Sequence, residues 1–272
     1  MGGYDSGGVA AALRMNDHRV SSWIELQEIL FGGTFQPSLQ RHRSRYVYRG
    51  APSVAHGLDT SLQTGGFEAH EKHLLTSFRK YAMRHAVHGD WVWNWLSLAK
   101  HHGLPTRLLD WTYSPLVAMH FATHDFRHFD LDGAIWMVDY QKTNASLPAP
   151  LRKILGDEQN IFTTEMLSSV ATTLEGFDML AAQDFVLFFE PPSLDERIVN
   201  QFALFSLPSS ATLQLEELLR RDETAYRRVI IPASLKWEVR DKLDQANITE
   251  RVLFPGLDGL SQWLKRYFTT RK

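Results

Sequence analysis

The chain has 272 residues, a formal net charge of −2 and no cysteine. The absence of cysteine excludes disulfides, Cys zinc sites, iron–sulfur clusters and a Cys nucleophile, and it favours a cytoplasmic setting. The near-neutral charge disfavours non-specific binding of nucleic acid by net charge, and the length suits one large domain or two small ones.

Residues 1–20 open the chain as a Gly-rich stretch with few large apolar side chains. This stretch lacks the basic start and the long apolar run of a secretory signal, so we interpret it as a flexible tail. No run of about 18 apolar residues follows, so we expect no membrane span and no membrane partner. Residues 21–272 contain no internal repeat and no dividing linker, and we interpret them as one domain.

The first structural signals are a helix, a strand and a longer helical region. Ser22 and Glu25 form a capping-box pattern that opens a helix ending near Gly32. The aromatic and β-branched run 46–48 predicts a short strand. Apolar side chains at spacings of three and four then predict a helical subregion over about 67–100.

The second half of the chain is richer in strands. Ser114 followed by Pro115 predicts a helix start, and that helix runs to about residue 124. Buried strands are predicted over 133–139, 184–190, 202–206 and 227–232, with helices from Ser234 and over about 257–267. Because regular β-α alternation is missing, this order predicts an α+β fold rather than a doubly wound sheet.

Several common catalytic motifs are absent from the sequence. It contains neither of the two common phosphate-binding glycine loops and no G-x-S-x-G nucleophile elbow. His120 and His124 have the spacing of a helical metal site, but no Glu follows the first His as it does in metalloproteases. We therefore interpret the pair as helix surface or packing, and we expect no metal.

The densest set of polar groups among apolar residues lies between His101 and Thr112. Arg107 and Asp110 lie three residues apart in this stretch, and charges in so apolar a setting are seldom buried unless they are paired. Two interpretations stay open. One is a structural salt bridge from Arg107 or Arg49 to Asp110, and the other is a ligand site.

Two further features are typical of anion binding. Arg49 ends a predicted strand and precedes Gly50, and a guanidinium binds phosphate or carboxylate in a bidentate manner. The helix start at Ser114 offers N–H groups to a phosphate, with Thr106 and Arg107 close in sequence. The structural alternatives are a surface arginine and an ordinary helix end.

A third candidate region runs from Glu190 to Phe205. It combines a strand end, a carboxylate cluster and Gln201, which enters the next predicted strand. Glu190 or Gln201 can point into a cleft, although a charged loop before a strand accounts for the same pattern.

Together these segments resemble the FRG domain family, which is named for an aromatic-Arg-Gly motif. That motif is found here at residues 48–50. The sequence departs from the family pattern at Lys100, where Gln is expected, and at Ala203, where Gly is usual. The resemblance covers about residues 22–265, and its further motifs are H-x-G-L-P-T-R-L-L-D-W-T at 101–112, S-P-L-x-A-x-x-F-A at 114–122, R-I-x-x-Q-x-x-x-F at 197–205 and F-P-x-L-D-G-L at 254–260.

The order of these elements is also similar, more distantly, to that of ADP-ribosyltransferases. The resemblance implies a central mixed or antiparallel, split sheet with an N-terminal helical insertion and flanking helices. It implies NAD as a substrate and a macromolecular acceptor, either nucleic acid or protein. A role as a bacterial toxin or phage-defence effector, with an antitoxin or regulator as partner, comes only from the resemblance.

The resemblance also implies roles for individual residues. Arg49 would hold the NAD diphosphate or ribose, Thr112 and Ser114 would occupy the middle motif, and Trp111, Tyr113 or Tyr48 would stack on a ring. Gln201 would take the third catalytic position, with Glu190 as the alternative carboxylate and Asp110 as a further catalytic candidate. The residues expected to bind NAD are Tyr48, Arg49, Gly50, His101, Thr106, Arg107, Trp111, Thr112 and Ser114.

The alternative function is a non-catalytic nucleotide- or nucleic-acid-binding module. A nuclease is disfavoured because no metal-binding carboxylate pattern stands out. The site requires Arg49 to lie beside the loop that carries Thr106, Arg107 and Asp110, so that both segments line one cavity.

Overall fold

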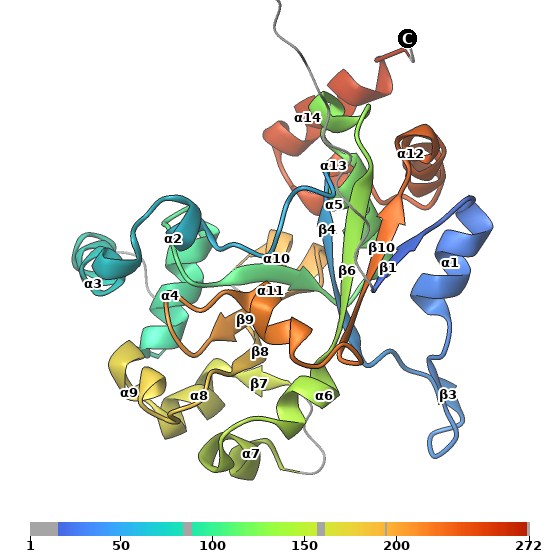
Figure 1. The fold of residues 1–272 in the computed structure, drawn as a ribbon. Coiled ribbons are helices and arrows are strands. Elements are labelled where there is room, and N and C mark those ends of the chain that lie inside the picture. Colours follow the sequence, from blue (N-terminus) through green and yellow to red (C-terminus); the bar gives the residue numbers. More distant parts are fainter. Residues whose placement is uncertain (1–15, 84–88, 157–160, 194, 271–272) are drawn as a thin grey trace, which may run out of the picture.

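The computed structural model describes residues 16–83, 89–156, 161–193 and 195–270. These residues form an α+β fold in which helices flank a mixed sheet of eight strands (Figure 1). The strand order is β1-β10-β6-β4-β5-β9-β8-β7. β1 and β7 pair in parallel with their neighbours, and the other pairs are antiparallel.

The strands of the large sheet are short, and a two-stranded hairpin lies apart from it. Their bounds are β1 (Asp17–Arg19), β4 (Tyr46–Ala51), β5 (Leu109–Thr112), β6 (Gly133–Asp139), β7 (Phe162–Thr163), β8 (Val186–Glu190), β9 (Ala203–Pro208) and β10 (Tyr226–Ile231), with β2 (Phe35–Gln36) and β3 (Arg41–His42) in the hairpin.

The α-helices are α1 (Trp23–Phe31), α2 (Ser61–Thr64), α3 (Glu71–Tyr81), α4 (Val92–His101), α5 (Pro115–Thr123), α6 (Tyr140–Ala145), α7 (Ala149–Leu155), α8 (Thr164–Val170), α9 (Leu174–Asp178), α10 (Glu196–Asn200), α11 (Leu215–Arg220), α12 (Lys236–Gln245), α13 (Glu250–Leu253) and α14 (Leu257–Tyr267). Short 3-10 turns are η1 (Glu68–His70), η2 (Phe126–His128) and η3 (Ala233–Leu235). No helix within the described ranges combines the length and the hydrophobicity that a membrane crossing needs.

The sheet divides between β4 and β5. β4 pairs with β6 along its whole length, but it pairs with β5 only at Tyr48 and Thr112. In Figure 1 β5 runs crosswise to β4 and β6. The sheet therefore consists of two halves, β1-β10-β6-β4 and β5-β9-β8-β7, and backbone pairing between them is minimal.

Hydrophobic packing holds the two halves together. One core cluster packs α1, α5 and α12 against the first half, and a second packs α4 and α7–α9 against the other half. A third cluster joins Val47 and Trp136 of the first half to Trp111 and Phe188 of the second. Because this cluster spans the junction, the junction is fixed by side chains rather than by strand pairing.

The predicted helix starts and strands are largely found in the structure. Ser22 caps α1 by accepting a hydrogen bond from Glu25, and Ser114 caps α5 with Pro115 at its first position. β6 spans the predicted residues 133–139, and β8, β9 and β10 lie within the other predicted strand regions or extend them by one or two residues.

The structure corrects the end of the predicted N-terminal tail. Residues 1–15 of that prediction lie outside the described residues, but Asp17–Arg19 form β1 on the edge of the sheet. Arg228 of β10 donates to both carboxylate oxygens of Asp17 at 2.6 Å, and both side chains are buried. This ion pair attaches the segment to the sheet.

Two elements beside the predicted site are additional to those that the sequence pattern predicted. Residues 109–112 form β5, in which Leu109 and Trp111 are buried while Asp110 is exposed. Residues 196–200 form α10, which Asp195 caps by accepting a hydrogen bond from Ile198 at 3.0 Å. Both are too short to give a clear periodic signal.

Candidate functional site

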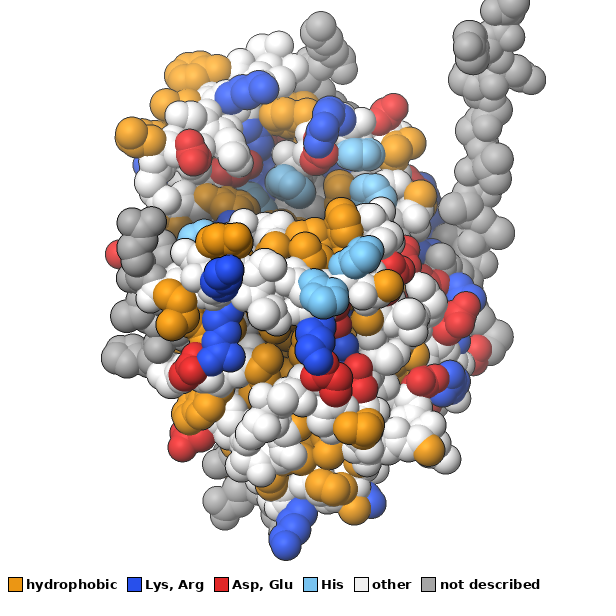
Figure 2. Space-filling model, turned by 90° about the vertical axis from the view of Figure 1, so that its left-hand side faces the viewer, with side chains coloured by type: hydrophobic (Ala, Val, Ile, Leu, Met, Phe, Trp, Pro, Cys, Tyr) orange, Lys and Arg blue, Asp and Glu red, His pale blue; other side chains and the backbone are white. Residues whose placement is uncertain are grey.

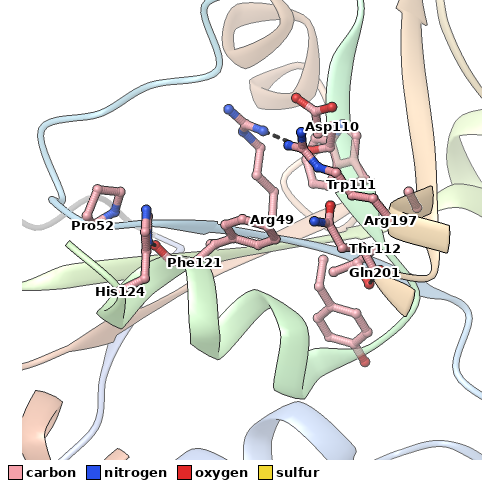
Figure 3. A pocket seen from close by; sticks show the side chains of 12 residues that line it. Arg49, Pro52, Asp110, Trp111, Thr112, Phe121, His124, Arg197 and Gln201 are labelled. Carbon is pink, nitrogen blue, oxygen red and sulfur yellow. Dashed lines mark hydrogen bonds between the residues drawn. The ribbon is translucent and has the colours of Figure 1, made fainter. Parts of the chain in front are cut away.

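A cavity of about 280 Å³ lies at the junction of the two sheet halves (Figure 3). Segments far apart in the sequence meet here. The lining residues are Tyr48, Arg49, Gly50 and Pro52 from β4 and its end, Asp110, Trp111 and Thr112 from β5, Phe121 and His124 from α5 and its end, and Arg197, Gln201 and Ala203 from α10 and the start of β9.

The cavity exists because β4 and β5 separate after their single backbone pair. Beyond Tyr48, the side chain of Arg49 spans the gap and donates from Nη1 to the backbone oxygen of Asp110 at 2.8 Å. At this point the hydrogen bond from the Arg49 side chain takes the place of backbone pairing between β4 and β5. Thus Arg49 joins the two halves and lines the cavity between them.

Gly50 allows α5 to pack directly on β4. A Cβ at this position would lie 1.9 Å from the backbone oxygen of Ala118 and 2.7 Å from the backbone nitrogen of Ala122. Only glycine fits this approach. The close packing brings Phe121 and His124, at the far end of α5, to the cavity wall.

Two guanidinium groups face the cavity. Figure 3 shows Arg49 and Arg197 pointing to the side where Asp110 lies. Within the part of the chain that the structure describes, neither forms an ion pair with a carboxylate. Burial lowers the pKa of Arg49, and Asp110 opposes this shift. Since an arginine stays protonated at neutral pH, the cavity presents positive charge to an anion.

Asp110 brings one carboxylate to the cavity, and Lys100 of α4 lies 2.9 Å from it. The Asp110 side chain is 58% exposed, and partial loss of water around its carboxylate raises the pKa, but Lys100 and Arg49 outweigh that effect and the pKa lies below its ordinary value. Asp110 is therefore ionised at neutral pH and is a weak proton acceptor. Lys100 is also a position where the sequence departs from the FRG pattern.

Gln201 is held from two sides at the end of α10. Its Nε2 donates to the backbone oxygen of Leu253 at 2.9 Å, and its own backbone oxygen accepts from Thr112 Oγ1 at 2.7 Å. The neighbouring Asn200 donates to the backbone oxygen of Val252 at 2.9 Å. The end of α13 therefore fixes the position of Gln201, and Oε1 is the side-chain atom that remains for a ligand.

The C-terminal helices hold α13 in place. Arg266 of α14 makes bidentate contacts with Glu250 and with Asp244, at 2.6–2.8 Å. Gly259 lies so close to α13 that a Cβ would fall 1.9 Å from the backbone oxygen of Phe254. Through α13, these contacts connect α12 and α14 to the cavity residue Gln201.

The structure brings seven of the predicted site residues to the cavity, which are Tyr48, Arg49, Gly50, Asp110, Trp111, Thr112 and Gln201. The rings expected to stack on a ligand are engaged elsewhere. The Trp111 indole donates to Ser206 at 3.0 Å, and the Tyr48 hydroxyl donates to Leu30 at 3.0 Å. The aromatic side chain that α5 adds to the cavity wall is Phe121.

Arg107 and Thr106 do not line the cavity with Arg49, contrary to the expected position of their loop. Arg107 is 2% exposed and makes paired contacts with Glu71 and Asp178. Thr106 is buried, and its backbone bonds to α2. Neither predicted salt bridge to Asp110 forms. Arg107 lies toward the helices that pack on the second half of the sheet, where it pairs with Glu71, and Lys100 is the ion-pair partner of Asp110.

Three other candidates also lie outside the cavity lining. Glu190, at the end of β8, accepts a hydrogen bond from the Tyr113 hydroxyl at 2.8 Å. Ser114 caps α5, and its backbone nitrogen donates to Thr112 Oγ1 at 3.0 Å. His101 lies 2.5 Å from Asp195 and so connects α4 to the start of α10. These residues contact the segments that carry the cavity residues, but they do not line the cavity themselves.

His120 and His124 differ in their surroundings. His120 is fully buried and its Nδ1 accepts from Arg240 at 3.0 Å, while burial holds its pKa well below the ordinary value. His124 reaches the cavity. Over the described residues, no group of three or more His, Asp or Glu side chains is arranged to hold a metal ion.

Several residues at the cavity were missed from the sequence alone. Phe121 and Arg197 lie inside the quoted motifs, so the motifs themselves carried the signal. Pro52 was not singled out, Lys100 was noted only as a departure from the family pattern, and His124 only as half of a metal-like pair. Their place at or beside the cavity depends on contacts between segments far apart in the sequence.

Comparison with known proteins supports the family resemblance over part of the chain. Residues 44–131 match the FRG domain. The matched FRG domain range holds β4, β5 and α5, and with them Arg49 and Asp110, whereas α10 with Arg197 and Gln201 lies beyond it. Searches among curated proteins and among solved structures found no match to the chain.

Proposed function

We propose that the protein is an NAD-dependent ADP-ribosyltransferase that modifies a macromolecule, and that the cavity at the sheet junction binds NAD. The observation that carries this proposal is that Arg49, Thr112 and Gln201 line the same cavity. They come from β4, β5 and the end of α10, in the order that the resemblance to ADP-ribosyltransferases implies.

The charges of the cavity suit the diphosphate of NAD. Arg49 and Arg197 offer two guanidinium groups, which bind phosphate oxygens in a bidentate manner. A second hollow of about 310 Å³ adjoins the cavity and shares Arg49, Gly50 and Pro52 with it. A dinucleotide can therefore extend over both spaces with its diphosphate at Arg49.

The proposed reaction breaks the bond between nicotinamide nitrogen and ribose C1. Nicotinamide leaves as a neutral molecule with the bonding electron pair, and positive charge develops on the ribose. An oxygen or nitrogen of the acceptor then bonds to C1 and gives its proton to solvent. Asp110, held ionised by Lys100, stabilises the positive charge, and Gln201 Oε1 orients a ribose hydroxyl.

A non-catalytic nucleotide-binding module is the second candidate. It is favoured by the position of Glu190, which bonds to Tyr113 and does not line the cavity. Gln201 cannot accept a proton from an acceptor group, and the lowered pKa of Asp110 makes it a weak base. In that case the cavity binds a nucleotide and releases no product.

Mass spectrometry of reactions with NAD separates the two candidates. The protein is incubated with NAD, with and without single-stranded nucleic acid or protein acceptors, and free nicotinamide and the acceptor mass are measured. Arg49→Ala should weaken NAD binding more than tenfold, because charge-assisted hydrogen bonds to the diphosphate are lost. Asp110→Asn should slow nicotinamide release, and the exposed Arg152→Ala should leave both unchanged.

Three outcomes are distinct. Nicotinamide release that depends on Arg49 and Asp110 supports the transferase. A thermal shift with NAD that Arg49→Ala abolishes, without nicotinamide under any condition, supports the binding module. If NAD neither stabilises the protein nor is consumed, the cavity is not an NAD site.

A further inference from the structure

Phe202 has an unfavourable backbone conformation for its residue type. It follows α10 and Gln201, and its φ of 46° is in the left-handed region. Glycine is the usual residue at this position after a helix, because the Cβ of any other residue crowds the backbone in this conformation. The backbone is fixed from both sides, since Phe202 donates to Val199 and accepts from Tyr113.

Packing does not offset this cost. Phe202 is 62% exposed, so most of its ring remains in water. A phenylalanine stabilises a fold mainly by removing its ring from water. At this position Phe therefore contributes little to folding, and a smaller residue would suit the backbone better.

The position of Phe202 suggests a role in binding. Both of its chain neighbours, Gln201 and Ala203, line the cavity, whereas Phe202 itself is not part of the lining. Its ring is thus presented to solvent beside the cavity. A molecule that approaches the cavity from outside meets an exposed flat aromatic surface next to Gln201.

We propose that Phe202 is a stacking platform for a nucleobase, and that the macromolecular acceptor is a single-stranded nucleic acid. The inference rests on the proposed function, because it assigns the acceptor of that reaction. Stacking on an exposed aromatic side chain requires an unpaired base, which a duplex does not offer. NAD itself would occupy the cavity and the adjoining hollow, so the ring outside them remains for the acceptor.

Among the charged side chains near Phe202, Arg197 is the one that a phosphate group can contact. Arg197 lies on α10, the short helix before Phe202, and also lines the cavity. It has no carboxylate partner among the described residues, and its guanidinium lies 4.9 Å from the centre of the Phe254 ring. The carboxylates of Asp195 and Glu190 also lie in this region, and their oxygens are directed to His101 and Tyr113. Glu196 is exposed, but adjacent helical residues point about 100° apart, so it does not share the face of Arg197.

The surface around the hollow agrees with this assignment. Figure 2 shows His side chains gathered around a hollow on the face that carries α2–α4, with both basic and acidic side chains nearby. His56 lines the hollow beside the cavity, and His124 lines the cavity itself. Neutral imidazoles at neutral pH can stack on bases and donate hydrogen bonds to them.

Fluorescence anisotropy with a labelled single-stranded oligonucleotide of mixed sequence, measured without NAD, tests the proposal. Phe202→Ala should weaken binding by roughly 5- to 100-fold, while Phe202→Tyr keeps the stacking ring and should restore it. Phe202→Gly should weaken binding equally without lowering the melting temperature. Phe268→Ala, which removes a phenylalanine that is 76% exposed at the end of α14, is the matched control and should bind like the wild type.

The test separates this inference from the NAD proposal. Hydrolysis of NAD without acceptor should be unchanged in Phe202→Ala, since the ring lies outside the cavity. Equal binding by the wild type and Phe202→Ala, or equal binding of duplex and single strand, would overturn the inference even if NAD is consumed. So would a wild-type protein that binds no oligonucleotide but labels proteins in a manner that depends on Phe202.

Discussion

At the scale of single residues, the site shows how one arginine can be functional while another nearby is structural. Arg49 and Arg107 both lie beside glycine- or proline-containing segments with apolar neighbours. Arg107 contacts two carboxylates from other elements, whereas Arg49 donates to a backbone oxygen and pairs with no carboxylate among the residues that the structure describes. The difference lies in which partners the fold brings to each guanidinium, and a free guanidinium facing a cavity is available to a ligand.

Arg107→Met should destabilise the protein by about 3–5 kcal/mol, because it leaves Glu71 buried without its partner. Urea unfolding followed by circular dichroism measures this loss. Arg49→Met, which removes no ion pair, is the comparison and should cost much less. If the Arg107→Met protein is as stable as the wild type but binds NAD more weakly, Arg107 belongs to the NAD site.

Lys100→Gln should raise the pKa of Asp110, because it removes both a nearby positive charge and a hydrogen bond from the carboxylate. Carboxyl-carbon NMR titration of Asp110 measures the shift. In the wild type, the lowered pKa means that Asp110 adds stability above its unfolded pKa and loses it as the pH falls through the folded pKa. The contribution of Asp110 to the pH dependence of stability should therefore be smaller in Lys100→Gln.

Lys72→Gln provides the control for Lys100→Gln, since it removes an exposed pair with Glu175 far along the chain from Asp110. It should leave the Asp110 titration unchanged. An unchanged Asp110 pKa in Lys100→Gln would show that Lys100 is not its counter-ion in solution.

At the scale of elements, the position of the cavity depends on close packing of α5 on β4. Gly50, Ala118 and Ala122 belong to the motifs quoted from the sequence, and the structure gives them a common reason. All three are small because backbone atoms of the helix approach the strand at these positions. The motifs therefore contain two kinds of residue. Some make the packing contact that positions Phe121 and His124, and Arg49 supplies the chemistry.

Gly50→Ala should destabilise the protein by about 1–3 kcal/mol, since its Cβ would overlap the backbone of α5 and force the helix outward. The same shift should weaken NAD binding by moving Phe121. Thermal unfolding and NAD titration measure the two effects. Gly176→Ala in α9 is the control, because its Cβ meets only side-chain atoms of Thr173 and Ala171, at 3.2 and 4.0 Å.

If Gly50→Ala unfolds at the wild-type temperature and binds NAD normally, α5 has more freedom than its contact with β4 indicates. Equal losses in Gly50→Ala and Gly176→Ala would point to a general effect of removing glycine rather than to the helix contact.

At the scale of the whole molecule, the N-terminal segment completes the sheet. β1 pairs with β10 on its outer edge, and Arg228 and Asp17 form an ion pair with side chains only 2% and 1% exposed. A segment that composition marks as a tail is part of the fold from Asp17 onward. The reason is long range, since the partner of Asp17 lies more than two hundred residues later in the chain.

Asp17→Asn should destabilise the protein by about 3–5 kcal/mol, because Arg228 would remain buried without a countercharge. Chemical unfolding measures the change. Asp258→Asn, at an exposed position of α14, should change stability by less than about 0.5 kcal/mol. A wild-type unfolding curve for Asp17→Asn would mean that β1 contributes little to the sheet in solution.

The sequence by itself predicted the elements that local physics determines. The caps at Ser22 and Ser114, the buried run 133–139 and the α+β class follow from side chains that act on their own neighbours in the chain. The motifs around Arg49, Asp110 and Gln201 also predicted which segments meet, and these residues do line one cavity.

Only the tertiary structure decided which groups line the cavity and which stabilise the fold. The ion pairs of Arg107, the countercharge of Asp110, the position of Glu190 outside the cavity and the exposure of Phe202 all depend on contacts between distant segments. No local pattern encodes them, because the direction of a side chain at a sheet junction depends on how the two halves diverge. At this junction the chain replaces strand pairing with the side chain of Arg49, and that replacement creates the candidate site.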